Sequence, residues 1–129
     1  MLESHPHASN ETGTAELAAC IEACFECAQT CTACADACLG EPSVAELVDC
    51  VRSDLDCADV CETTGRVLSR RTAPDQDVIR ALLETCALAC KRCGDQCAEH
   101  ADHHEHCRTC AEACRRCERA CRDLLTTLR

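Results

Sequence analysis

Cysteine is the residue that could do the most chemistry in this chain. It accounts for 18 of the 129 residues, and neighbouring cysteines are mostly three or four positions apart. Side chains at that spacing lie next to one another on an α-helix, with Cβ atoms about 5–6 Å apart. The spacing therefore predicts stripes of thiols, each along one face of a helix. In chain order the stripes are Cys20, Cys24, Cys27, Cys31, Cys34 and Cys38; Cys50, Cys57 and Cys61; Cys86, Cys90, Cys93 and Cys97; and Cys107, Cys110, Cys114, Cys117 and Cys121.

Thiolates arranged in stripes are ligands for a soft metal ion. Sulfur ligands of this kind select Cu(I), Zn(II) or iron–sulfur clusters. Cu(I) replaces a thiol proton without changing the local charge, so a buried column of Cu(I) thiolates avoids the cost of burying charge. Zn(II) held by four thiolates is doubly negative and needs a tetrahedral set. We therefore expect all 18 cysteines to bind many Cu(I) ions through shared sulfurs, without catalysis.

Two other metal chemistries fit part of the pattern. A general store for Zn(II) or Cd(II) would use the same thiols. An iron–sulfur or dithiol redox protein is the second alternative, because C-x-x-x-C-x-x-C occurs at residues 20–27 and 86–93. That spacing resembles the cluster motif of radical S-adenosylmethionine enzymes, but no β/α barrel accompanies it. Inert packing of cysteines as small apolar groups is disfavoured for so many of them.

Two histidines and one aspartate occupy positions where a stripe predicts cysteine. When the first stripe is shifted by 66 residues, Cys34 and Cys38 fall on His100 and His104. We expect both imidazoles to contact metal, and His103 and His106 to lie in solvent. Asp54 interrupts the second stripe, and we expect it to accept protons from the core thiols or to hydrogen-bond with them.

Caps and breaks divide the chain into four helices. Thr14 is a predicted cap, and Ser43 with Glu46 has the spacing of a capping box. Helices are predicted near residues 14–39, 43–71, 75–101 and 103–128, with a disordered tail over 1–13. Short connections make neighbouring helices antiparallel, so the fold class is all-α, an up-down-up-down four-helix bundle with a cysteine-lined core over residues 14–129.

The two ends of such a bundle differ in chemistry. Cys38, His100 and His104 converge at one end, which we call the histidine end. The opposite, leucine end is predicted to gather Leu17, Leu68, Val78, Leu82, Leu124 and Leu128. Metal is expected to pass through the histidine end, because an apolar plug offers it no ligands.

Composition limits the partners that we expect this protein to bind and the compartment in which we expect it. A net charge of -10 and an aromatic content of 1% disfavour nucleic-acid binding, which needs basic and stacking side chains. No apolar run approaches the ~20 residues of a membrane span. The first residues lack the basic start and apolar core of a secretory signal, so we expect a cytoplasmic protein with reduced thiols.

These stripes resemble those of the bacterial copper storage proteins, and in particular their cytosolic branch. The resemblance covers residues 14–128 and rests on the four stripes, with C-x-x-x-C pairs such as Cys20/Cys24, Cys86/Cys90 and Cys117/Cys121. It implies a homotetramer of bundles that bind many Cu(I) ions and carry out no catalysis. The copper donor and recipient are not indicated. The second stripe departs from the pattern, with three cysteines and Asp54.

Overall fold

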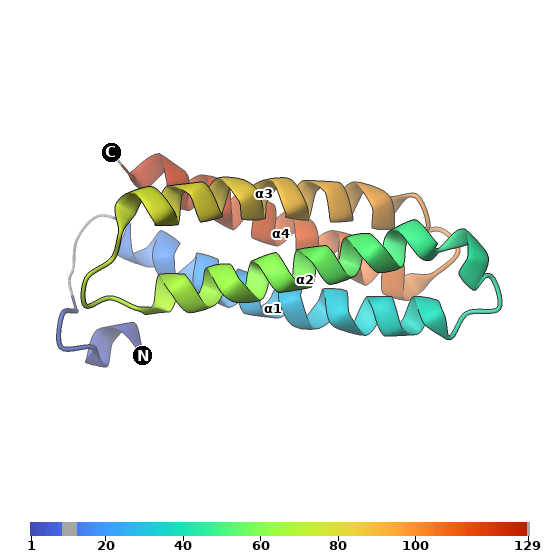
Figure 1. Cartoon of the computed structure of the whole chain (residues 1–129), viewed down its shortest axis with the longest axis horizontal. Coiled ribbons are helices and arrows are strands. Elements are labelled where there is room, and N and C mark those ends of the chain that lie inside the picture. The colour runs from blue at the N-terminus through green and yellow to red at the C-terminus, as the bar shows by residue number, and fades with distance from the viewer. Residues whose placement is uncertain (9–12, 129) are drawn as a thin grey trace.

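Four long helices form an elongated bundle in the computed structural model, which describes residues 1–8 and 13–128 (Figure 1). The helices are α1 (Thr14–Leu39), α2 (Val48–Ser69), α3 (Gln76–Ala98) and α4 (Glu105–Thr127). Consecutive helices run in opposite directions, and each packs on two others: α1 and α3 both contact α2 and α4. The described residues contain no strand. The predicted all-α four-helix bundle is confirmed.

The predicted helix boundaries hold for α1 and shift elsewhere. Helix α2 begins at Val48, because Val44–Glu46 first form a 3-10 turn (η2) in which Ser43 makes no side-chain cap. The predicted capping box is therefore wrong. Helix α4 begins at Glu105, so residues 103 and 104 lie in the preceding connection. At the start of α1, Gly13 rather than Thr14 is the N-cap, with a left-handed φ of 100° that suits glycine.

The predicted N-terminal tail is only partly described. Leu2–Ser4 form a short 3-10 turn (η1), and residues 9–12 lie outside the described part of the chain, as does residue 129. None of the described helices is long and apolar enough to cross a membrane.

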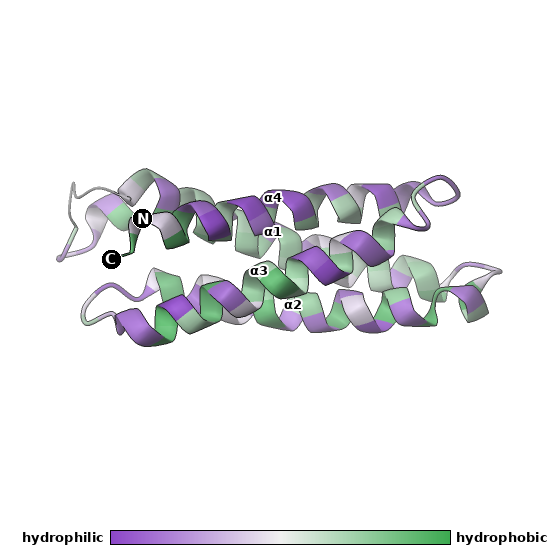
Figure 2. Ribbon diagram, turned by 90° about the horizontal axis from the view of Figure 1, so that it is seen from above, coloured by the Kyte–Doolittle hydropathy of each residue, from purple (hydrophilic) through white to green (hydrophobic). Residues whose placement is uncertain are grey.

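The core of the bundle is a column of thiols closed by larger side chains. All 18 cysteines are buried, none more than 2% exposed. Leu47 is buried near the histidine end, while Leu68 and Leu83 are buried toward the leucine end. Hydrophobic and hydrophilic residues alternate along the helices, as expected when one face is inside (Figure 2). Protonated thiols thus pack as small apolar groups along the middle of the molecule.

Two residues predicted for the leucine end are misplaced. Val78 is 49% exposed, and Leu82 is only partly buried, whereas Ile79 and Leu83 are buried. The stripe of α3 steps back from Cys86 by three and then by four residues, so Leu83 and Ile79 continue it. The correct positions follow from the spacing of the α3 cysteines, which alternates between three and four residues.

The reduced, metal-free chain is expected to fold without metal, because thiols and leucines already fill the core. Circular dichroism of protein reduced under argon should show a strongly helical spectrum, and urea should unfold it in one cooperative transition. A random-coil spectrum for the reduced apoprotein would contradict this prediction.

Candidate metal centre

Thiols from different helices meet along the axis of the bundle. The Sγ–Sγ distances across the core include 3.5 Å for Cys61–Cys90 and 3.6 Å for Cys50–Cys97. Toward the leucine end, Cys20 and Cys121 approach to 3.8 Å, although they lie 101 residues apart in sequence. Sulfurs this close can share one ion, since metal–thiolate bonds are about 2.3 Å long for an ion such as Zn(II).

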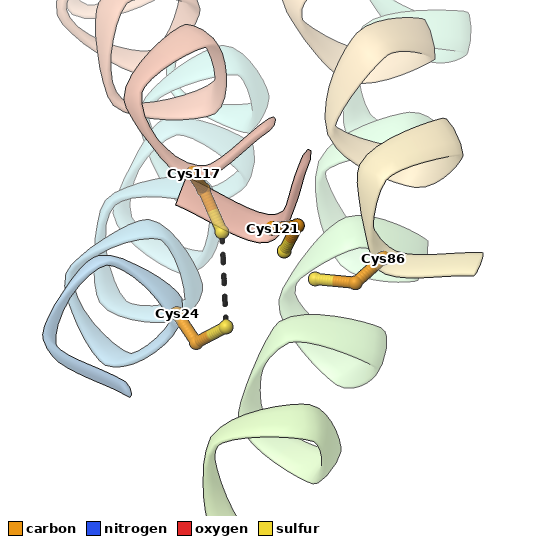
Figure 3. A group of neighbouring side chains, drawn as sticks. All are labelled: Cys24, Cys86, Cys117 and Cys121. Atoms are coloured by element: carbon orange, nitrogen blue, oxygen red, sulfur yellow. Dashed lines mark hydrogen bonds between the residues drawn. The ribbon is translucent and has the colours of Figure 1, made fainter. Parts of the chain in front are cut away.

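Several sets of four ligand atoms lie within 4.8 Å of one another. In one set Cys24, Cys86, Cys117 and Cys121 point toward a common centre from three helices, with 3.8 Å between the sulfurs of Cys117 and Cys24 (Figure 3). Further sets are Cys27, Cys57, Cys61 and Cys90; Cys27, Cys31, Cys57 and Cys114; and Cys31, Cys93, Cys110 and Cys114. Because Cys27 and Cys31 each belong to two of these sets, the sites overlap and their sulfurs can bridge neighbouring ions.

The histidine end adds an imidazole to the thiols, and it is His106. Its Nδ1 lies 3.4 Å from the sulfur of Cys34 and 3.6 Å from that of Cys107, and it forms a four-ligand set with Cys34, Cys38 and Cys107. The expectation that His106 lies in solvent is therefore wrong. His106 is the residue before Cys107 and does not lie on the cysteine stripe of α4. Its imidazole, in the first turn of the helix, is nevertheless long enough to reach the sulfurs of Cys34 and Cys107.

The two predicted histidines lie close to this set. His104 is the residue before α4, and its Nδ1 is paired with the carboxylate of Glu41. The ring of His104 stacks on that of His106, with centroids 5.4 Å apart. His100 lies in the connection after α3, where its backbone N–H donates to the carbonyl of Cys97. Metal contact by His100 and His104 stays a prediction.

Protonation differs among the thiols at the histidine end. Burial raises the pKa of Cys38 to about 11, and it also raises the pKa of Cys107. The hydrogen bond with Cys110 lowers the pKa of Cys34, and the bonds with Cys50 and Cys97 act in the same direction. Burial lowers the pKa of His106, but its hydrogen bonds with Cys34 and Glu41 outweigh burial and raise it.

Asp54 lies inside the thiol column, completely buried. Its Oδ1 accepts hydrogen bonds from the thiols of Cys93, Cys110 and Cys97 at 3.0, 3.2 and 3.3 Å. Burial raises the pKa of Asp54 to about 9. The carboxyl is thus protonated at neutral pH, so the resting core carries no net charge at this point.

Known proteins share both the sequence and the fold. The chain matches the copper storage protein family over residues 13–126. A Streptomyces lividans copper storage protein structure loaded with 10 copper equivalents is 57% identical, with a TM-score of 0.93, covering 97% of this chain and 95% of that one. A second structure from that species, a cytosolic copper storage protein with five coppers, is 60% identical with a TM-score of 0.87, covering 88% and 95% of the two chains. A Bacillus subtilis cysteine-rich protein, YhjQ, is 36% identical over 106 residues, or 82% of this chain and 93% of that protein.

Replacing Asp54 by Asn should stabilise the metal-free protein, increasingly so as the pH rises. Asp54 keeps its proton in the folded state up to about pH 9, but loses it near its ordinary value of 3.8 when unfolded. Between those values folding must take up a proton, so this residue lowers the free energy of unfolding as pH rises. The neutral amide of Asp54→Asn takes up no such proton.

The measurement is the urea midpoint of reduced apoprotein at pH 5 and pH 8. The difference between Asp54→Asn and wild type should widen toward pH 8, while Asp59→Asn, at an exposed position of α2, should show a constant difference. Equal pH dependence in wild type and Asp54→Asn would show that the buried carboxyl is ionised.

Proposed function

The chain belongs to the copper storage protein family, and from this we propose that it stores and buffers many Cu(I) ions in the cytoplasm. The observation that carries the proposal is the overlap of the four-ligand sets. Within a set the ligand atoms lie within 4.8 Å of one another, the sets together draw on all four helices, and some sulfurs belong to two sets. An enzyme's metal site needs a substrate beside one or a few ions. A continuous column of ligands instead suits the holding of many ions, and we assign no catalysis to it.

We assign the ligands to one storage unit, residues 14–129. All 18 cysteines are proposed as thiolate ligands. His106 joins Cys34, Cys38 and Cys107 through Nδ1, while His100 and His104 are proposed to contact Cu(I) as it passes the histidine end. Each ion that binds releases a thiol proton. Asp54 is protonated at rest, so we propose that it relays these protons: Oδ1 takes one from a thiol while Oδ2 passes its own toward the sulfur of Cys50, 3.9 Å away.

The charge of the core favours Cu(I) over Zn(II) or Cd(II). Among the described residues, the buried polar side chains are Asp54 and Thr64, and neither is a cation. A buried Zn(II) held by four unshared thiolates would therefore keep a double negative charge with no buried partner. One Cu(I) per thiolate leaves the column neutral, which the apolar packing around it requires.

Titration of the reduced apoprotein with Cu(I), under argon and against a chromophoric chelator, tests the storage function. We expect binding of about one ion per cysteine, roughly 18 per chain, because soft thiolates can be shared between Cu(I) ions. Protein loaded with Cu(I) and Zn(II) in competition should retain copper.

Two results would decide against this function. Saturation at one or two Cu(I) ions per chain would exclude storage. A brown protein with visible absorption after anaerobic purification would support the iron–sulfur alternative instead.

We further propose that the bundles assemble as homotetramers, and that an apolar groove beside the α1–α2 connection is one contact between copies. The groove is lined by Leu39, Val44, Val48, Val51, Arg52, Leu55 and Asp56. Val48 and Leu39 are 61% and 60% exposed, far more than apolar side chains that face the core. Arg52 and Asp56 lie one helical turn apart, so two antiparallel copies of α2 can pair the Arg52 of each with the Asp56 of the other.

Val48→Glu should break this contact, because a carboxylate would be buried in an apolar interface without a partner. Light scattering after size-exclusion chromatography should show species smaller than the tetramer, with copper bound per chain unchanged. Val48→Ile, which keeps an apolar side chain, is the matched control and should remain tetrameric. A monomeric wild-type protein, or a tetrameric Val48→Glu, would contradict the assigned contact.

A further inference from the structure

We propose that Glu41 positions the two imidazoles of the histidine end, holding each in the tautomer that offers a free nitrogen to incoming Cu(I). The inference rests on the proposed storage function and adds a residue that binds no metal itself. Glu41 follows Gly40, the C-cap of α1, and precedes η2, so the α1–α2 connection brings it to the start of α4.

One carboxylate oxygen serves both rings. Oε2 of Glu41 lies 3.1 Å from Nε2 of His106 and within hydrogen-bonding distance of Nδ1 of His104. The contacts are partly shielded from water, since the side chains of Glu41, His104 and His106 are 26%, 17% and 26% exposed. The hydrogen bond from His106 lowers the pKa of Glu41, which favours its carboxylate form.

A carboxylate only accepts hydrogen bonds, so both ring nitrogens that face it must carry a proton. His106 is therefore held with its proton on Nε2, and His104 with its proton on Nδ1. The two rings adopt opposite tautomers because they approach the same oxygen from different edges. The nitrogens left for a metal are Nδ1 of His106 and Nε2 of His104.

The nitrogen of His106 that is left free for a metal is the one that faces the thiols. Nδ1 of His106 is the atom that lies 3.4 Å from the sulfur of Cys34 and 3.6 Å from that of Cys107. Without Glu41 the ring is free to rotate or to change tautomer, and the ligand set with Cys34, Cys38 and Cys107 loses its fixed nitrogen.

A mere clamp between the α1–α2 connection and α4 would use the same contacts, so the test reads tautomers directly. Long-range 1H–15N correlation spectra of reduced, metal-free protein labelled with 15N-histidine distinguish Nδ1–H from Nε2–H. In wild type we expect Nε2–H at His106 and Nδ1–H at His104, the less common form of a free imidazole. Glu41→Ala should lose the Nδ1–H preference of His104, and Glu41→Gln, whose amide oxygen still accepts, should retain it.

The rate of Cu(I) uptake provides a second test of the role of Glu41. Stopped-flow uptake of Cu(I) from a chelating donor should be about 10-fold slower in Glu41→Ala, at the lower end of the loss in metal affinity or activity that follows removal of a group that orients a metal ligand. Glu41→Gln should recover most of the rate. Glu46→Ala removes an equal charge from the neighbouring turn η2, at an exposed side chain, and should behave as wild type.

The outcomes separate this inference from the function on which it rests. Unchanged tautomers in Glu41→Ala, or uptake equal to that of Glu46→Ala, would overturn the role of Glu41 even if the chain still binds many Cu(I) ions. A wild-type chain that saturates at one or two ions would instead overturn the storage function, whatever the spectra show. Circular dichroism of each variant establishes that its helices are intact.

Discussion

Contact between protonated thiols is the interaction on which the rest of this structure depends. The same sulfurs that would bind metal are the atoms that fill the space between the helices, since all 18 cysteines are buried and few large apolar side chains accompany them. Such a core is stable only while it is uncharged, because isolated ions in an apolar interior are very costly. Exchange of a proton for a monovalent ion preserves that condition. The need for neutrality therefore links the packing of the empty bundle to the identity of its ligand.

The two ends of the bundle differ in the side chains that they present. At the leucine end, the side chains of Leu68 and Leu124 are almost fully buried. The connections at the other end bring together residues distant in sequence, Glu41 from before η2 and His104 and His106 from around the start of α4. Helices hold the ligands in fixed register, whereas connections supply the polar groups that face the solvent.

The register of the cysteines predicted most of this molecule. Alternating steps of three and four residues determine a helix and the face that it buries, so four helices and a thiol core follow from spacing alone. Continuing the same alternation from Cys86 leads to Leu83 and Ile79, which shows that Val78 and Leu82 were assigned by a wrong step. The place of His106 could not be obtained in this way, since its contact with Cys34 depends on where α4 begins. Glu41 carries no periodic signal either, because its partner His106 lies 65 residues away.

The contact between Cys20 and Cys121 has a consequence for the turnover of the protein. The two residues are separated by 101 positions, nearly the whole described bundle. An ion that bridges them closes a loop of that length, and each further bridge between helices removes more of the freedom that an unfolded chain would gain. A filled bundle must release metal before it can open, whereas an empty one can open directly. Proteases that act on opened chains will therefore remove empty copies first, so degradation itself would spare the copies that hold copper.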